Sequence, residues 1–138
     1  MIEAREVTKR FDGTKVIEDV SVQFEQGITN LIIGQSGSGK TVLMKCLVGL
    51  HEVDDGAVYF EDTNVTQMKR DQRKSLRKQM GMLFQGGALF DSLNVEQNVR
   101  FPLDLYWDSS YKEKLERVNF CLEKVDLAGV NDKMPGEL

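Results

Sequence analysis

Eight consecutive residues carry the side chains with the clearest chemical use. Residues 34–41 read Gly-Gln-Ser-Gly-Ser-Gly-Lys-Thr and fit the pattern G-x-x-x-x-G-K-[ST] at every fixed position. An apolar segment, 28–33, precedes them, and a helix-like segment, 42–50, follows. This strand, loop and helix order is the one that a phosphate-binding loop requires. The alternative is a glycine-rich turn of purely structural use, and the flanking segments argue against it.

Each residue type in the loop suits a polyphosphate. Glycines permit backbone conformations that a Cβ forbids, so successive N–H groups can face one anion at the positive end of a helix. Lys40 would place an ammonium between the β- and γ-phosphates, and the Thr41 hydroxyl would take one coordination position on Mg²⁺. The sequence therefore predicts a nucleoside triphosphate as the ligand. The predicted site comprises Gly34, Gln35, Ser36, Gly37, Ser38, Gly39, Lys40 and Thr41.

The elements that must position this loop indicate an α/β domain. Residues 2–11 and 16–24 read as strands joined by an Asp-Gly hairpin, and residues 28–33 are apolar on both faces, as in the middle of a covered parallel sheet. Residues 42–50 place apolar side chains on one side at helical spacing. A turn at 54–56, a short strand at 57–60 and an apolar strand at 81–84 follow.

A basic run lies between these last two strands. Residues 69–79 contain six Lys or Arg side chains against one acid, Asp71. The run could contact phosphates or lipid headgroups. A solvated helix face is the simpler interpretation, and we favour it here.

The last third of the chain is predicted to be helical. Residues 94–100 form a short helical piece that Pro102 should stop, because proline lacks an N–H and disfavours helix before it. Ser110 and Glu113 have capping-box spacing, and an apolar stripe then predicts an amphipathic helix over about 110–125. Residues 126–138 read as a loop.

Composition sets limits on the function. The chain has 138 residues, 41% hydrophobic and 29% charged, which suits one soluble globular domain at most. Its formal charge of −4 gives no general reason to expect nucleic acid or an anionic membrane as a partner. No apolar run approaches the roughly 18 residues that a membrane span needs, and the N-terminus has no apolar signal region. We therefore expect a cytoplasmic location.

The order of the motifs along the chain distinguishes among the classes of phosphate-loop protein. An antiparallel hairpin precedes the loop, a Gly-Met-Leu-Phe-Gln strand and turn follow it at residues 81–85, and Asn-Val-Glu-Gln-Asn-Val follows at 94–99. Over the whole chain this resembles the nucleotide-binding domain of ATP-binding cassette (ABC) transporters. Residues 84–95 look like the ATPase subunits of the lipid-trafficking systems that work with periplasmic MCE-domain proteins.

This resemblance implies roles for further residues. Phe11 stands where the family places an aromatic ring under the adenine of ATP, and Val16 would flank the base; a core residue at the end of a strand is the alternative for Phe11. Gln85 matches the glutamine that reaches toward Mg²⁺ and the attacking water, or else caps a strand. The segment after Gln85 would receive the membrane subunit, the permease, on an apolar patch or would be ordinary core. The patch would comprise Ala88, Leu89, Phe90 and Leu93.

The resemblance also implies a fold, partners and missing parts. We expect a truncated ABC ATPase fold: an antiparallel β region and a partial RecA-like parallel core with the phosphate loop over residues 1–92, then the start of a helical subdomain over 93–138. The aspartate and the catalytic glutamate that follow the signature motif lie beyond residue 138 in this family, so we expect the chain alone to bind nucleotide with negligible turnover. The complete protein would bind Mg·ATP between two copies and meet the membrane only through the permease, at its inner face.

Two other classes are weighed against this. A phosphate-loop kinase or GTPase would need a second-substrate pocket or an Asn-Lys-x-Asp motif, and the sequence has neither. A non-catalytic ATP-sensing module would suit the missing carboxylates. ATP affinity without hydrolysis, and without a permease partner, would favour the second.

Overall fold

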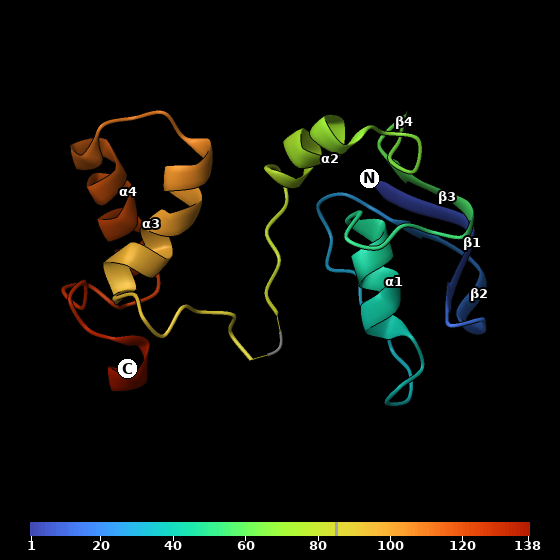
Figure 1. Ribbon diagram of the computed structural model, residues 1–138, viewed down its shortest axis with the longest axis horizontal. Coiled ribbons are helices and arrows are strands. Elements are labelled where there is room, and N and C mark those ends of the chain that lie inside the picture. Colours follow the sequence, from blue (N-terminus) through green and yellow to red (C-terminus); the bar gives the residue numbers. More distant parts are fainter. Residues whose placement is uncertain (85) are drawn as a thin grey trace. The chain divides into compact units, whose positions relative to one another are not determined.

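The computed structural model describes residues 1–84 and 86–138, which form two compact units, Met1–Gly81 and Met82–Leu138 (Figure 1). Our sequence-based division after residue 92 stays a prediction. Each unit has its own hydrophobic core.

A four-stranded antiparallel sheet forms the frame of the first unit. The strands are β1 (Ile2–Phe11), β2 (Thr14–Phe24), β3 (Asp55–Phe60) and β4 (Thr63–Asn64), in the order β2-β1-β3-β4. The Asp-Gly hairpin between β1 and β2 is confirmed: Asp12 and Gly13 both adopt positive φ, as the tightest hairpin turns require. Strand β3 begins two residues earlier than predicted and includes most of the predicted turn at 54–56.

A bulge in β1 sets the close approach of β3. The pairing of β1 with both neighbours shifts register around Glu6, which has a φ of 51°. Gly56 packs directly on this point: an added Cβ would lie 2.3 Å from the carbonyl oxygen of Glu6 and 2.4 Å from that of Arg5. Only glycine fits here, since its φ is 80° and backbone occupies the space that a side chain would fill.

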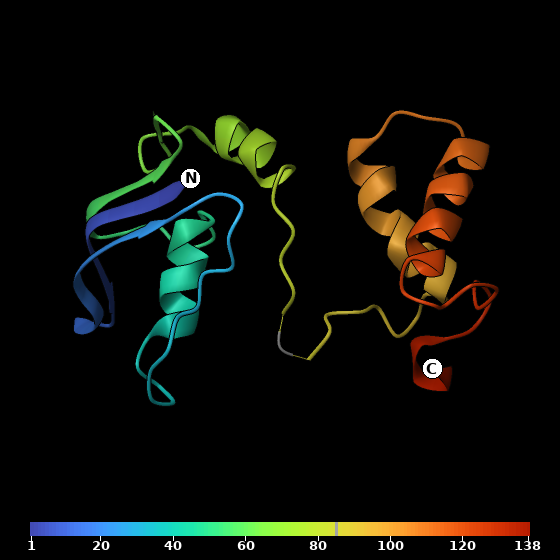
Figure 2. The same cartoon turned by 180° about the vertical axis from the view of Figure 1, so that it is seen from behind.

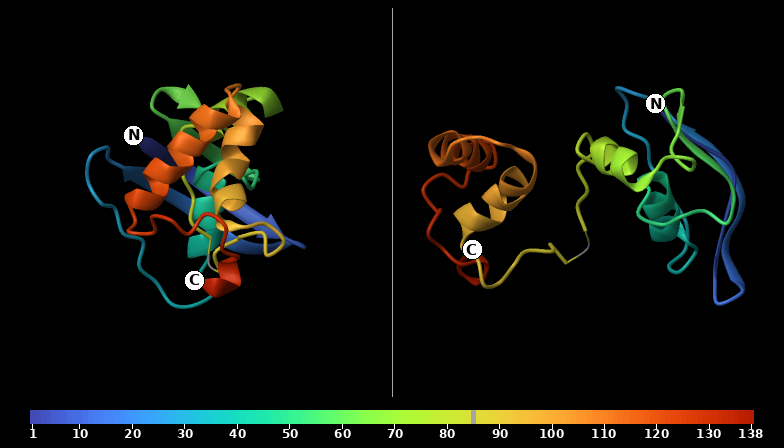
Figure 3. Two further views of the ribbon diagram at one scale, coloured as in Figure 1. Left: turned by 90° about the vertical axis from the view of Figure 1, so that its left-hand side faces the viewer. Right: turned by 45° about the horizontal axis from the view of Figure 1, so that its top comes forward.

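Helix α1 (Lys40–Leu47) packs against the sheet (Figure 3). Leu43, Cys46 and Leu47 are buried on its inner side, as the apolar spacing predicts. The helix ends three residues before the predicted end at residue 50, and Leu50, predicted on the same side, is 41% exposed. They contact core residues of the strands, which are Ala4, Val7, Ile17 and Val58. The phosphate-loop sequence therefore leads into a helix held by a packed core.

The predicted parallel strands are wrong in this structure. Residues 28–33 and 81–84 are irregular, and the first of them runs as an open trace before α1 (Figure 2). Leu31 is 78% exposed, Ile33 83% and Leu83 91%. A parallel strand is stable only with paired neighbours and covered faces, and the described residues give neither segment a strand partner. The described fold therefore keeps the antiparallel region without the partial parallel core.

Helix α2 (Arg70–Arg77) confirms the predicted basic helix. Gln72 accepts the Lys69 N–H at 2.9 Å and caps its start. Leu76 is buried in the core, and Arg73 reaches across to Glu52 at 2.7 Å. These contacts hold an eight-residue helix that would be marginal alone.

The second unit is a helical hairpin of α3 (Val95–Tyr106) and α4 (Tyr111–Glu123), followed by a 3₁₀ turn at Pro135–Glu137. The prediction that Pro102 stops α3 is wrong, because the helix continues for four residues beyond it. Packing explains why the missing N–H is tolerated. Leu103 contacts the core of Val95, Val118 and Leu122.

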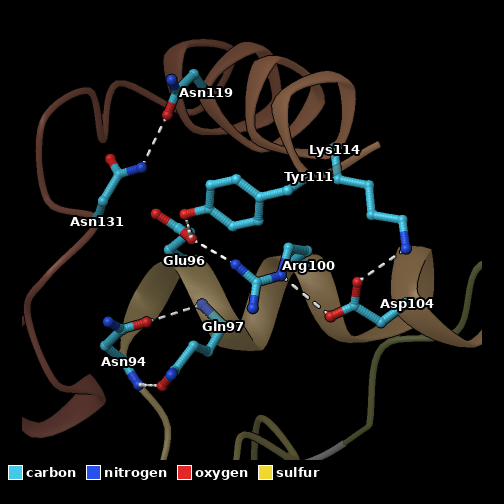
Figure 4. Close-up of polar contacts among 9 residues, drawn as sticks. All are labelled: Asn94, Glu96, Gln97, Arg100, Asp104, Tyr111, Lys114, Asn119 and Asn131. Carbon is cyan, nitrogen blue, oxygen red and sulfur yellow. Dashed lines mark hydrogen bonds and ion pairs between the residues drawn. The ribbon is translucent and has the colours of Figure 1, made fainter. Parts of the chain in front are cut away.

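Ion pairs also fasten the second half of α3 (Figure 4). Arg100 lies between Glu96 at 2.6 Å and Asp104 at 3.0 Å on its own helix. From α4, Lys114 contacts Asp104 at 3.1 Å and the Tyr111 hydroxyl donates to Glu96 at 2.9 Å. The guanidinium of Arg100 first, and then Lys114, lowers the pKa of Asp104. Side chains on both sides of Pro102 therefore tie α3 to α4.

The predicted capping box of α4 is confirmed. Ser110 Oγ accepts the Glu113 N–H, and Glu113 accepts from the Ser109 hydroxyl and from the hydroxyl and N–H of Ser110. These bonds, that of Ser109 foremost, lower the pKa of Glu113 from 4.5 to about 2. Ionised Glu113 is thus a component of the helix start.

We predict an acid-sensitive helix start. Since the folded pKa of Glu113 is depressed, its stabilisation is present above pH 4.5 and is lost as the pH falls toward about 2. A carboxyl-detected NMR titration should place the Glu113 midpoint near 2, and Ser109→Ala should raise it. Glu113→Gln serves as the assignment control, because its side chain has no carboxyl resonance. A wild-type midpoint at 4.5 would contradict this.

Candidate functional site

The phosphate-loop sequence forms a turn that closes around its own lysine. The Lys40 ammonium donates to the carbonyl oxygens of Gly34 and Gln35, both at 2.7 Å. The Ser38 N–H donates to the Gln35 oxygen at 3.2 Å and tightens the turn. The lysine therefore points back over the loop.

Two glycines give the loop its path. Gly37 has a φ of 79° and Gly39 a φ of 90°, which residues with a Cβ rarely adopt. A Cβ on Gly39 would lie 2.7 Å from the Val16 carbonyl oxygen. A third glycine, Gly34, lies where a Cβ would be 2.8 Å from Ser38 Oγ. The glycine pattern thus serves both backbone conformation and close packing.

The start of α1 is electrostatically open to an anion. Gly39 is the N-cap residue and supplies no side-chain hydrogen bond, and the first turn of α1 has no acidic residue. The N–H groups and positive dipole end of this helix are therefore available, as at other phosphate-binding helix starts. Thr41 is exposed in this first turn, next to Lys40.

The two predicted base-binding residues have different contacts in the structure. Val16 touches the loop at Gly39, so the structure brings these two predicted site residues together. Phe11 is 40% exposed, and its ring lies edge-on to His51, 5.4 Å between centroids. Its role under a base stays a prediction.

A carboxylate orders the strand end that carries Phe11. Asp54 accepts the Arg10 N–H at 2.5 Å and the Lys9 ammonium at 3.3 Å. The Arg10 bond is the larger cause of the lowered pKa of Asp54. This interaction was missed from the sequence, where Asp54 was assigned to a turn.

Gln85, predicted to reach toward metal and water, lies outside the described residues. After it, Leu89 and Phe90 are 56% and 46% exposed, as an apolar patch requires, and Leu93 is half-buried. The Phe90 ring packs on Phe101, with centroids 4.8 Å apart. The function of this patch stays a prediction.

Sequence reasoning missed the residue that fixes this segment. Asn98 Oδ1 accepts the Phe90 N–H at 2.8 Å, and its Nδ2 donates to the Leu93 and Asn94 carbonyl oxygens at 2.9 and 3.0 Å. The side-chain amide thus replaces backbone partners for a loop. The available signal was a second asparagine four residues after Asn94, whose side chain caps the start of α3 by accepting the Gln97 N–H.

A loop of this pattern at the start of a core-packed helix defines a phosphate-loop nucleotide-binding protein. The family described as "ABC transporter" matches residues 17–138, and the chain belongs to it. Curated relatives include the methionine import ATP-binding protein MetN of Clostridium tetani, 38% identical over 138 residues, and the phosphonates import ATP-binding protein PhnC of Fusobacterium nucleatum, 32% identical over 135. A third is the probable ribonucleotide transport ATP-binding protein mkl of Mycobacterium leprae, 34% identical over 137.

The fold agrees with this family. The dimeric structure of the ATP-binding cassette MJ0796, in a post-hydrolysis state bound to ADP and Pi, matches all of this chain with a TM-score of 0.88 and 25% identity. The chain spans 63% of that protein, and it covers 43%, 55% and 40% of the three curated relatives, against 100%, 93% and 99% of itself. The ABC ATPase fold is thus present in part.

The described residues, 1–84 and 86–138, lack two features that bear on membranes and metals. No helix among them has the length and apolar character for crossing a membrane. No cluster of three or more His, Cys, Asp or Glu side chains among them is arranged to hold a metal ion.

Proposed function

We propose that this protein is the ATP-binding subunit of an ABC import transporter. The observation that carries the proposal is the loop at residues 34–41, with the Lys40 ammonium held over two of its carbonyl oxygens at 2.7 Å. The names of the relatives, which include methionine import and phosphonates import, support import as the direction. The ligand would be ATP with Mg²⁺.

The residues of the loop fit a triphosphate. Gly37 and Gly39 adopt positive φ and have no side chain, so successive backbone N–H groups can face an anion. Lys40 is held by neutral carbonyls, and no carboxylate of the described residues is among its hydrogen-bond acceptors, so a phosphate oxygen can join its coordination without breaking a charged pair. Bound Mg²⁺ would neutralise phosphate charge, and Thr41 would hold it through the hydroxyl.

Thr41 provides a test of the metal's place. In the absence of metal, Thr41→Ala should bind ATP with nearly the wild-type affinity. It should lose most of the increase in ATP affinity that Mg²⁺ gives the wild type. Thr41→Ser, which keeps the hydroxyl, is the matched control and should behave as the wild type. Titrations with a fluorescent ATP analogue, with and without Mg²⁺, measure both. Equal Mg²⁺ dependence in all three proteins would contradict the assignment.

The wider assembly follows from the family. We propose that two copies enclose Mg·ATP, as supported by the dimeric cassette that matches this chain, and that Gln85 positions water and metal. A permease would dock on the patch that includes Leu89 and Phe90, and it would hold the protein at the inner face of the membrane. Sedimentation of the purified protein with and without Mg·ATP tests the dimer. The mass of the protein should increase when Mg·ATP is added, and a mass that does not change would count against the dimer.

The cargo is proposed from a shorter stretch. Residues 84–95 resemble the ATPases of MCE-type lipid trafficking, which supports phospholipid, whereas the named relatives support a small solute. Affinity purification from membranes through this subunit, followed by identification of the permease and its bound molecules, decides between the two. A permease that retains phospholipid supports lipid, and one that retains an amino acid or phosphonate excludes it.

A further inference from the structure

Helix α2 and its two cap residues, Lys69 and Lys78, contain two groups of cations with different surroundings. The first group serves the fold: Arg73 pairs with Glu52 at 2.7 Å and donates to the Thr66 carbonyl oxygen at 2.9 Å, and Arg77 Nε donates to the Arg73 carbonyl oxygen at 3.3 Å. Both of these side chains are half-buried. Arg73 therefore ties α2 to Glu52 and Thr66 of the same unit, and Arg77 contacts its own helix.

The second group is exposed, and we name it the α2 basic face. It consists of Lys69, Arg70, Lys74 and Lys78. Arg70, Lys74 and Lys78 follow one another at intervals of four, so they form a row along one side of the helix. Like charges at this spacing destabilise a helix by a few tenths of a kcal/mol per pair. Alternating charge along one face indicates a solvated helix with salt bridges, and the row of Arg70, Lys74 and Lys78 does not alternate.

The net charge of the chain conceals this concentration. Residues 69–78 contain six cations and one acid, a net charge of +5. Since the whole chain carries −4, the other residues together carry −9. The total charge indicates no general attraction to anions. Electrostatic attraction acts over about one Debye length, so an anion near α2 responds to the local charge of this helix and is attracted.

We propose that the α2 basic face is a peripheral contact for a bilayer surface that is rich in anionic phospholipid headgroups. Clusters of four or more Lys and Arg on one helix are typical of such contacts. A protein partner would instead be expected to need an apolar or aromatic anchor at the centre of the contact. Leu76 is the one apolar side chain of α2, and it is buried. Charge complementarity therefore carries the proposal.

The membrane setting rests on the proposed function, but the contact itself needs no nucleotide. It adds a direct lipid contact to the one that the permease would provide. The test is therefore performed without ATP, and its outcome is independent of whether Lys40 binds a phosphate. Failure of vesicle binding and failure of ATP binding can be told apart.

The experiment measures flotation of the purified protein with vesicles. Phosphatidylglycerol mixed with phosphatidylcholine should bind the protein at low salt, and pure phosphatidylcholine should not. Arg70→Gln with Lys74→Gln should lower binding about 25-fold, taking roughly fivefold for each cation. Glutamine forms helix well and removes the like-charge pair, so α2 should remain folded. Salt at about 1 M, where the Debye length is about 3 Å, should abolish binding.

The control removes the same charge elsewhere. Lys112→Gln with Lys133→Gln changes two exposed lysines of the second unit and should alter binding less than twofold. Equal losses in both double variants, or no binding to anionic vesicles, would overturn the proposal. The proposal would also be overturned if the protein failed to bind vesicles but was retained, through α2, on DNA or on a polyglutamate resin. The α2 basic face would then bind nucleic acid or an acidic protein.

Discussion

Replacing Lys40 with alanine should raise the dissociation constant for ATP on the order of a hundredfold. A charge-assisted hydrogen bond contributes about 1.5–3 kcal/mol, and the ammonium would make at least one such bond to a phosphate oxygen. In the structure its acceptors are the Gly34 and Gln35 carbonyl oxygens, so the side chain is already directed over the loop. Isothermal titration of wild type and Lys40→Ala with Mg·ATP measures the difference.

The same helix offers a matched control. Lys45 lies in the last turn of α1, whereas Lys40 begins it. Lys45→Ala removes the same charge and should change ATP affinity less than twofold, because cations near a helix C-terminus act on that end. Circular dichroism should show both variants folded. An unchanged affinity in Lys40→Ala, or equal losses in both, would mean that the phosphate site lies elsewhere.

Replacing Gly56 with alanine should produce the largest loss of stability in the first unit, on the order of 4 kcal/mol. The new Cβ would be 2.3 Å from the Glu6 carbonyl oxygen and 2.4 Å from that of Arg5. Both atoms are backbone, so the clash cannot be relieved by rotation of a side chain. The pairing of β1 with β3 must therefore open at the bulge. Urea unfolding followed by circular dichroism measures the loss.

A substitution at a second glycine, Gly13, distinguishes the cost of this clash from the cost of backbone strain. Gly13 has nearly the same φ, 79° against 80°, but nothing lies within 4 Å of its added Cβ. Gly13→Ala should therefore cost only the strain of the left-handed conformation, about 1–2 kcal/mol. If the two variants lose equal stability, the close approach of β3 to the bulge does not determine the cost.

Local patterns predicted the elements that local contacts stabilise. The hairpin at Asp12 and Gly13 and the capping box at Ser110 and Glu113 both depend on residues close in the sequence. The inner side of α1 followed from apolar spacing alone. Such features need no knowledge of the rest of the fold.

Features that depend on distant partners were not predictable in this way. Residues 28–33 have the composition of a buried parallel strand, but strand formation depends on neighbours that composition does not specify. Pro102 breaks an isolated helix, yet the packing of Leu103 and the ion pair of Asp104 with Lys114 carry α3 beyond it. In both cases tertiary contacts, or their absence among the described residues, overrode local preference.

For the candidate site, the residue types were predictable and their contacts were not. The pattern at residues 34–41 predicted the loop, and the structure places Val16 against Gly39 of this loop. The carbonyl partners of Lys40, and the bond of Asn98 to Phe90, depend on backbone geometry that no spacing rule encodes. The roles of Phe11, Val16 and Gln85 stay predictions.

The most direct measurement is a backbone amide NMR titration of the purified protein with Mg·ATP. If the glycine-rich loop binds the triphosphate, the largest shifts should fall on residues 34–41, and Lys40→Ala should remove them. Shifts centred on α2, whose basic face is the other concentration of positive charge, would contradict this account, as would an unperturbed loop at saturating nucleotide.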